Sequence, residues 1–422
     1  MKIGLQTWGS EGDVRPMVAL SAGLHEAGHE VTLGISSSDN KDYSHYAKKF
    51  GFSISKVGHL IIDHDKMKHL VLKASKTNNI MKHLSIIWEA IYDPFLKDMT
   101  EFSKALCQKN DLLIGHFTVH PLKNAAELFQ KKHVSVGLNY NAIPTKFIPP
   151  SGMPNLGKFF NPFLWKTAEI LTSIYFSKRF NELRLQEGLK PINKMLPDAF
   201  SSNTLNLLAI SSLLCEKQSD WSDHHKICGF FNMPIEGEDK ALPDGLEEFL
   251  NAGEKPIYIT FGSMMGVSVE YAEETTKILI EAIKKAGVRA ILQSEWDQLN
   301  YKTDDKNIYP VTSANHQSIF PKCSLIIHHG GAGTTQSSVL ASVPSIVVPH
   351  VLDQFFWAKE LKRIHVSKGS INRKNLTSQK LAILIQMSLE SKELEINAVK
   401  AAEIMRNENG VKRAIDLIEQ LN

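Results

Sequence analysis

Short apolar runs that alternate with helical patterns constrain the fold of this chain most. Lys2–Thr7 and Glu30–Ile35 have the composition of buried strands, and Met17, Leu20 and Leu24 recur between them at helical spacing. A strand, a helix and a strand in such close succession predict a βαβ unit with parallel strands. The alternation therefore favours an α/β fold built on a parallel sheet.

The same alternation occurs twice along the chain. The polar stretch Asn232–Pro243 contains glycine and proline and has the composition of a linker, and a new strand follows at Pro256–Phe261. Two such runs predict two Rossmann-like, doubly wound domains that face each other across a cleft, where ligands would bind. We expect an N-terminal domain over residues 1–235, a C-terminal domain over 243–400, and a helix over 401–422 that packs back on the N-terminal domain.

Composition narrows the classes of partner. The 422 residues carry a formal net charge of only +3, so no basic surface for nucleic acid is expected. The four cysteines form no C-x-x-C pair, which favours reduced thiols. The first apolar run is interrupted at Gln6 and Thr7, and no run approaches the ~20 apolar residues that span a bilayer. We expect a cytoplasmic protein.

The most informative motif is the glycine-rich turn HHGGAGTT, which begins at His328 and follows an apolar strand. A helix start presents unpaired N–H groups and a partial positive charge, and glycines let a ligand approach the backbone closely. An imidazole beside the turn can donate one more hydrogen bond. The motif thus favours a diphosphate site, although glycines also serve tight strand-to-helix turns that bind nothing.

Two polar residues follow the next strand of this half. Asp353 can accept hydrogen bonds from sugar hydroxyls, and Gln354 can donate and accept them. Asp353 would equally suit the N-cap of the helix that begins there. Both roles stay open for Asp353.

The first half has its own polar turn, Gly9–Asp13, at the end of the first strand. Transfer to a hydroxyl needs a group that takes the hydroxyl proton, and Asp13 can serve as this general base. Asp13 also suits the N-cap of the helix that we expect to enter at Pro16.

These motifs together resemble a known family. HHGGAGTT, VPSIVVPH and DQFFWA in the second half, with GSEGDVRPMVAL and YITFGSM before them, are similar to motifs of the inverting, UDP-sugar-dependent small-molecule glycosyltransferases with the GT-B fold. The resemblance extends over nearly the whole chain. It is strongest to the branch that holds the sterol glucosyltransferases and the bacterial antibiotic glycosyltransferases.

The resemblance implies roles for particular residues. It implies that Asp13 is the catalytic base and that Gly12, Phe163 and Trp165 contact the acceptor. The loop that binds the base of the nucleotide keeps His316, but the aspartate and tryptophan of the family pattern are missing from it. The residues implied for the donor are Gly262, Ser263, His316, His329, Gly331, Gly333, Thr334, Asp353 and Gln354.

The expected reaction moves a hexose, glucose by resemblance, from a UDP-sugar to a hydroxyl of a lipophilic small molecule such as a sterol. No metal and no cofactor are expected, because a helix start can neutralise the diphosphate. Asp63-His64-Asp65 resembles a D-x-D metal motif, and His224-His225 beside Asp223 could bind a metal, but both groups are interpreted as surface residues. The competing hypotheses are a sugar-nucleotide epimerase or hydrolase and a non-catalytic nucleotide-sugar-binding protein. The first turn lacks the G-x-G-x-x-G of an NAD oxidoreductase.

The aromatic segment Phe159–Gln186 has three interpretations: core, acceptor pocket, or a helix that contacts a membrane peripherally. The sequence leaves all three open.

Overall fold

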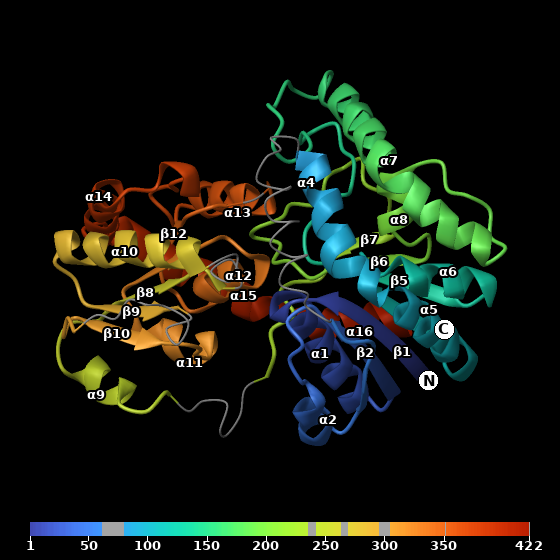
Figure 1. The fold of residues 1–422 in the computed structure, drawn as a ribbon, viewed down its shortest axis with the longest axis horizontal. Helices are drawn as coiled ribbons and strands as arrows, with labels where there is room; N and C mark the ends of the chain where they lie inside the picture. The colour runs from blue at the N-terminus through green and yellow to red at the C-terminus, as the bar shows by residue number, and fades with distance from the viewer. Residues whose placement is uncertain (61–79, 235–241, 263–268, 295–303, 351, 422) are drawn as a thin grey trace. The chain divides into compact units, whose positions relative to one another are not determined.

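The structure is a computed structural model that describes residues 1–60, 80–234, 242–262, 269–294, 304–350 and 352–421. The chain forms two compact units, Met1–Met233 with Asn409–Asn422 and Pro234–Glu408, called here the first and the second unit. Each unit is a parallel sheet with helices on its faces (Figure 1). The predicted fold class, α/β with two doubly wound domains, is confirmed.

In the described part of the first unit the sheet has seven strands, in the order β3-β2-β1-β4-β5-β6-β7. Every neighbouring pair is parallel; Ile3, for example, pairs with Val31 on one side and with Leu112 on the other. The strands are β1 Lys2–Gly9, β2 Glu30–Ser37, β3 Ser53–Lys56, β4 Leu112–His116, β5 Lys132–Gly137, β6 Leu205–Leu208 and β7 His225–Ile227. The helices are α1 Glu11–Glu26, α2 Ser44–Phe50, α4 Ile80–Ile87, α5 Leu96–Lys109, α6 His120–Leu128, α7 Asn161–Gln186, α8 Met195–Phe200 and α16 Gly410–Glu419, with short π and 3₁₀ turns at Trp88–Tyr92 and Asp93–Phe95.

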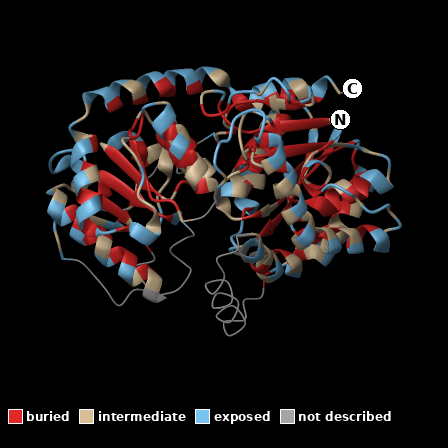
Figure 2. Ribbon diagram, turned by 90° about the horizontal axis from the view of Figure 1, so that it is seen from above, coloured by how far each residue is buried: buried red, intermediate tan, exposed pale blue. Residues whose placement is uncertain are grey.

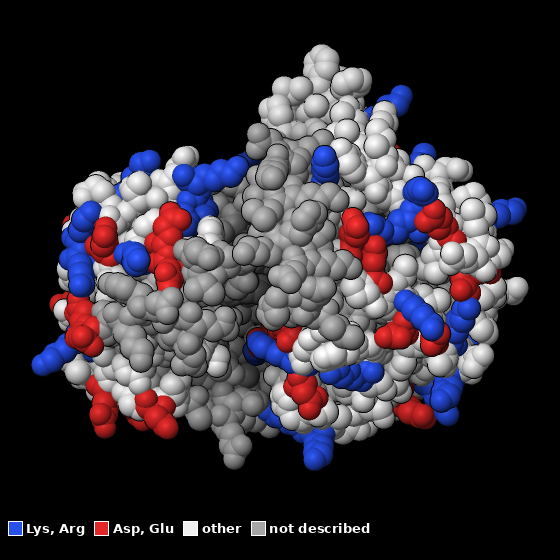
Figure 3. All heavy atoms as spheres, in the orientation of Figure 1, with Lys and Arg blue, Asp and Glu red and all other residues white. Residues whose placement is uncertain are grey.

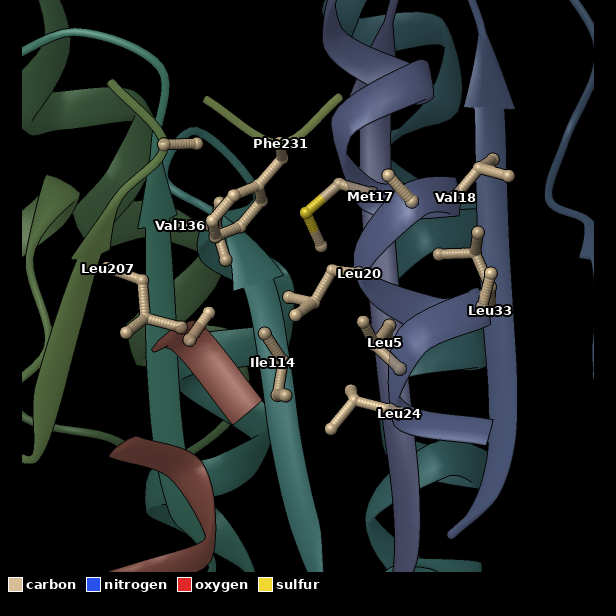
Figure 4. Packing of buried hydrophobic residues seen from close by; sticks show 14 of the residues in the cluster. Leu5, Met17, Val18, Leu20, Leu24, Leu33, Ile114, Val136, Leu207 and Phe231 are labelled. Carbon is tan, nitrogen blue, oxygen red and sulfur yellow. The ribbon is translucent and has the colours of Figure 1, made fainter. Parts of the chain in front are cut away.

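One core lies between this sheet and α1. Met17, Leu20 and Leu24 of α1 pack against Leu5 and Ile114 of the central strands (Figure 4). Residues of α16, from the far end of the sequence, join the same cluster. The C-terminal segment is therefore part of the first unit because its apolar side chains are buried there.

In the described part of the second unit the sheet has five parallel strands, in the order β10-β9-β8-β11-β12. Its strands are buried, whereas its helices expose their outer sides (Figure 2). The strands are β8 Ile257–Thr260, β9 Ala290–Gln293, β10 Ile308–Val311, β11 Leu325–His328 and β12 Ser345–Val347. The helices are α9 Leu246–Asn251, α10 Val269–Ala286, α11 His316–Ile319, α12 Ala332–Leu340, α13 Leu352–Arg363, α14 Ser378–Leu389 and α15 Lys392–Glu408, with 3₁₀ turns at Phe320–Lys322 and Arg373–Asn375.

Two helix boundaries differ from the sequence-based expectation. Helix α1 begins at Glu11 rather than near Pro16, because Ser10 is its N-cap. The expected single C-terminal helix is interrupted at Asn409, whose φ of 45° is left-handed and whose side chain accepts from the Lys412 N–H of the next helix. This break divides the segment between α15 in the second unit and α16 in the first.

Buried histidines make the first unit sensitive to acid. His120 shares a hydrogen bond of 2.9 Å with the Tyr92 hydroxyl and stacks on Phe180 at a ring distance of 4.0 Å. Burial lowers the pKa of His120 to about 3, below its ordinary value of 6.5. Burial lowers the pKa of His116 to about 3 as well.

Between pH 6.5 and pH 3 the unfolded chain therefore binds protons that the folded chain excludes, and stability falls as pH falls through this window. We expect His120→Gln to reduce the dependence of the unfolding free energy on pH below 6 by up to about 1.4 kcal/mol per pH unit. Urea unfolding at pH 5, 6 and 7 measures this slope, and His45→Gln on exposed α2 is the control. An unchanged slope in His120→Gln would show that His120 is protonated in the folded state.

Candidate functional site

The strand order of each sheet reverses direction once. In the first unit the reversal lies between β1 and β4, and in the second between β8 and β11. Helices leave such neighbouring strands toward opposite faces, so their carboxyl ends open a crevice in which α/β proteins bind ligands. Asp13 follows β1 and His116 ends β4, while Gly262 follows β8 and His329 follows β11. Each unit thus has polar residues at its switch point.

Asp13 lies in the first turn of α1, where it forms a capping box with Ser10. Its Oδ2 accepts hydrogen bonds from the Ser10 N–H at 3.0 Å and from the Ser10 hydroxyl at 3.3 Å. Gly9 has a φ of 133°, and a Cβ there would lie 2.3 Å from Asp13 Oδ2. The carboxylate is therefore fixed by one oxygen, and only glycine at position 9 leaves room for it.

The other carboxylate oxygen of Asp13 faces His116. Oδ1 lies 3.7 Å from His116 Nε2, and the imidazole is buried. His116 Nδ1 lies 2.7 Å from the Thr118 hydroxyl. If Thr118 donates to Nδ1, the His116 proton is on Nε2 and points at the carboxylate; the opposite tautomer would place a lone pair against a negative charge. Because burial lowers the pKa of His116 to about 3, the ring that faces Asp13 is neutral.

The residues expected to contact the acceptor lie in different surroundings. Gly12 is exposed in the first turn of α1. Trp165 is buried in the inner side of α7, and its Nε1 donates to the Ile148 carbonyl at 2.8 Å. Phe163 is exposed on the outer side of the same helix. Trp165 is thus part of the packed side of α7, whereas Phe163 lies on its exposed side.

His329 occupies the centre of the site in the second unit. A Cβ on Gly331 would lie 2.6 Å from His329 Nε2, and one on Gly262 would lie 3.3 Å from Cε1, so the ring is held between two glycines. Its Nδ1 is buried and has no hydrogen-bond partner among the described residues. Burial, with His350 and His316 nearby, lowers the pKa of His329 to about 3. A neutral imidazole with an unsatisfied nitrogen suits a polar ligand.

Helix α12 begins directly beside this ring, with Gly331 at its N-cap and Gly333 and Thr334 in its first turn. The first N–H groups of a helix are unpaired and carry its positive end, so an anion is stabilised there. Among the residues that the structure describes, none lies within 4 Å of where a Cβ on Gly333 would be. The Thr335 hydroxyl is buried without a hydrogen-bond partner among the described residues. By contrast, His328 Nδ1 accepts from the Gly330 N–H at 3.1 Å and supports the turn itself.

The polar pair after β12 lies at the start of α13. Helix α13 begins at Leu352, so Asp353 is in its first turn, and burial raises the pKa of its carboxyl above the ordinary value. Gln354 is buried, and its Oε1 accepts from the His350 N–H at 2.7 Å. The side-chain amide oxygen of Gln354 therefore holds the preceding loop in place.

The loop expected to bind the nucleotide base is an aromatic stack. His316 lies parallel to Phe320 at a ring distance of 4.3 Å and edge-on to Tyr258 at 6.1 Å. Asn315 caps this short helix by accepting from the Gln317 N–H at 3.0 Å. Ser263, like Asp63-His64-Asp65, lies outside the described residues.

The described residues bring no three His, Cys, Asp or Glu side chains together in a way that could hold a metal ion. The interpretation of His224-His225 as surface residues is wrong for His225, which is buried on β7; His224 packs beside it with a ring distance of 4.5 Å.

The chain is similar to known glycosyltransferases. Residues 305–415 match the family described as erythromycin biosynthesis protein CIII-like, C-terminal domain. The chain is 28% identical to a UDP-sugar-dependent glycosyltransferase of Dictyostelium discoideum, covering 100% of this chain and 26% of that protein. It is 26% identical to a sterol 3-beta-glucosyltransferase of Arabidopsis thaliana, covering 98% of this chain and 64% of that protein. The chain spans about a quarter of the length of the first relatives it matches.

Solved structures share the fold over the full length. The glycosyltransferase of kitacinnamycin has a TM-score of 0.71 at 15% identity, covering 100% of this chain and 98% of its own. The glycosyltransferase VinC, solved in complex with DTDP, has a TM-score of 0.66 at 17% identity, covering 100% and 99%. The chain therefore shares the GT-B fold of these glycosyltransferases, and its sequence is similar to UDP-sugar-dependent glycosyltransferases.

Residues that the sequence analysis did not select lie at both sites. His116 faces Asp13 at 3.7 Å and contacts Thr118, while His350 lies near His329. A signal for His116 was present in the sequence, because an apolar strand that ends in histidine occurs at His116 as it does at His328. Only the strand order, which places β4 beside β1, shows that His116 lies near Asp13.

The contact between Gly331 and His329 gives a direct test of the site. We expect Gly331→Ala to weaken UDP binding about tenfold or more, because the new methyl group must displace the imidazole or the start of α12. Isothermal titration calorimetry with UDP measures the change. Gly369→Ala in the same unit is the control, since a Cβ there meets nothing within 4 Å. Equal affinity of both variants would remove His329 from the binding site.

Proposed function

We propose that this chain is an inverting glycosyltransferase that moves glucose from UDP-glucose to a hydroxyl of a sterol or a similarly lipophilic alcohol. One observation carries the proposal. In the first unit the Asp13 carboxylate, held through one oxygen, follows the switch-point strand β1; in the second unit the start of α12, with the unsatisfied imidazole of His329 beside it, follows the switch-point strand β11. The first suits a general base, and the second suits a departing diphosphate.

The donor is assigned to the second unit. The diphosphate binds at the start of α12, where Gly331, Gly333 and Thr334 present backbone N–H groups and His329 adds a neutral donor. Asp353 and Gln354 face the sugar hydroxyls, and His316 contacts the nucleoside. Charge builds on the diphosphate as the bond to the sugar breaks, so these donors stabilise the transition state more than the bound donor. In this proposal the helix start replaces a metal ion.

The acceptor is assigned to the first unit. As the acceptor oxygen forms its bond to sugar C1, its proton passes to the Asp13 carboxylate, the bond between C1 and the diphosphate oxygen breaks, and UDP leaves with the electron pair. A single displacement of this kind inverts the configuration at C1. Gly12 and Phe163 are assigned to the acceptor side, together with Trp165, which shapes it by packing under the loop at Ile148.

The identities proposed for the sugar, the nucleotide and the acceptor are inferred from the names of relatives. The Dictyostelium relative is named for UDP-sugars and the Arabidopsis relative for sterols. VinC was solved with DTDP, a different diphosphate. The stacked pair His316 and Phe320 offers a flat surface without a base-specific contact, which fits either pyrimidine.

Replacing Asp13 tests the reaction. We expect Asp13→Asn to lower kcat for transfer from UDP-glucose to a sterol by about 10²- to 10⁴-fold, because asparagine keeps the shape and the bond from Ser10 but takes up no proton. UDP affinity should stay unchanged. Product mass and UDP release measure the effect, and exposed Asp223→Asn is the control.

Acceptor-independent UDP release from the wild-type chain would instead favour a hydrolase. UDP-glucose binding without turnover would favour a non-catalytic binding protein. Full activity of Asp13→Asn would show that another group takes the proton.

His116 acts through Asp13 and is a positioning residue. We expect His116→Val, which removes the Nε2–H that faces Oδ1, to lower kcat about tenfold with an unchanged KM for UDP-glucose. His116→Gln keeps an amide donor and should recover most of the rate. If both variants lose the same activity, or if KM for the donor rises, the role of His116 is structural instead.

A further inference from the structure

Helix α7 has an apolar outer side that the described structure leaves uncovered. Phe163, Ile170 and Ile174 recur at helical spacing on this side and are 69%, 52% and 68% exposed. The loop before the helix adds Phe159, which is 82% exposed, and Phe160, which is 64% exposed. The opposite side of α7 is buried through Trp165, Phe176 and Phe180, so exposure of the outer side does not reflect a loosely packed helix. We call Leu156, Phe159, Phe160, Phe163, Ile170 and Ile174 the α7 outer face.

Positive charge gathers around the first part of this face. Residues 141–168 contain Lys146, Lys158 and Lys166 and no acidic residue. Farther along α7 the cations are paired, Lys178 with Glu182 at 3.8 Å and Arg179 with Asp93 at 3.1 Å. Glu169 accepts hydrogen bonds from the N–H groups of Met195 at 2.6 Å and Leu196 at 2.9 Å, so its charge is compensated at the start of α8. Lys158 and Lys166 are exposed beside the apolar side chains. In Figure 3 the surface around the start of α7 is almost wholly white, the colour of residues other than Lys, Arg, Asp and Glu.

Other exposed apolar side chains lack this arrangement. Ile396 and Val399 of α15 are about as exposed as Ile170, but Glu395 and Lys400 directly adjoin them in the sequence. Interspersed charges of both signs are typical of an ordinary solvated helix. The first part of the α7 outer face, with Phe159, Phe160 and Phe163, has lysines and no acidic residue in its own stretch of sequence, 141–168.

We propose that the α7 outer face docks on a bilayer that carries anionic headgroups, with its phenylalanines among the acyl chains and Lys158 and Lys166 at the headgroups. Lysine stems can lie along the apolar surface while their ammonium groups reach the phosphates. The helix lies in the plane of the interface. Among the described residues no helix is long and apolar enough to cross a membrane. A lipophilic acceptor resides in such a bilayer, so the contact also shortens its path to Asp13; this last step rests on the proposed function.

Flotation with vesicles tests the docking without any need for turnover. We expect the wild-type chain to float with vesicles of phosphatidylcholine and phosphatidylserine and to bind pure phosphatidylcholine vesicles more weakly, by about fivefold for each lysine that contacts the surface. Phe159→Ser with Ile174→Gln should lower binding to both kinds of vesicle. Lys158→Gln with Lys166→Gln should remove only the preference for phosphatidylserine. Ile396→Ser with Val399→Ser on α15 is the matched control and should float like the wild type.

Activity toward two acceptors separates this proposal from the enzymatic one. Transfer to a water-soluble phenol should be equal in the wild type and in Phe159→Ser with Ile174→Gln, whereas transfer to a sterol in phosphatidylserine vesicles should fall in the variant. Absence of flotation by the wild type would overturn the docking proposal, as would equal flotation of the α7 and α15 variants. A dimer in the wild type that the α7 substitutions dissolve would show that a second copy covers the face, and would overturn it too.

Discussion

The order of parallel strands is the constraint on which both sites depend. In each sheet the chain winds outward in one direction and then in the other, and the two innermost strands end side by side. Polar residues follow these strand ends: Asp13 is partly exposed there, whereas His116 is buried. Asp13 and His116 come together at one such point although about a hundred residues separate them, and Gly262 and His329 come together at the other. In each unit the strand order within one sheet brings these residues together, however long the chain between them is.

Burial determines what the histidines at these points can do. An imidazole in a low-dielectric site loses its proton before a solvated one does, and the pKa values of His116 and His329 are lowered to about 3 for this reason. At neutral pH both rings are uncharged and donate through one nitrogen only. His116 can therefore orient the Asp13 carboxylate without neutralising it, whereas a protonated ring would form an ion pair and hold the proton that the base must accept. His329 can meet a diphosphate without the desolvation penalty of a buried cation.

The sequence predicted the elements and the polar turns well, because both are local. Met17, Leu20 and Leu24 predicted α1, and HHGGAGTT predicted the start of α12, since hydrophobic spacing and glycine are read within a few residues. The partner of Asp13 could not be predicted in this way. His116 is its neighbour only because β4 lies next to β1, and no pattern in the sequence states which strands pair. The break at Asn409 was missed for a related reason: the helical pattern continues across it, and the burial of α16 against α1 decides its course.

The two interpretations of Asp13, helix cap and base, are compatible because a carboxylate has two oxygens. Oδ2 accepts both bonds from Ser10 and ties the side chain to the start of α1, and this fixes the torsion angles that direct Oδ1. Oδ1 then faces His116 across a distance slightly too long for a full hydrogen bond. Gly9 is needed for this arrangement, since a side chain there would collide with Oδ2 and break the capping bond. The cap therefore does not compete with the base; it supplies the rigidity that a base needs to meet a proton in one direction.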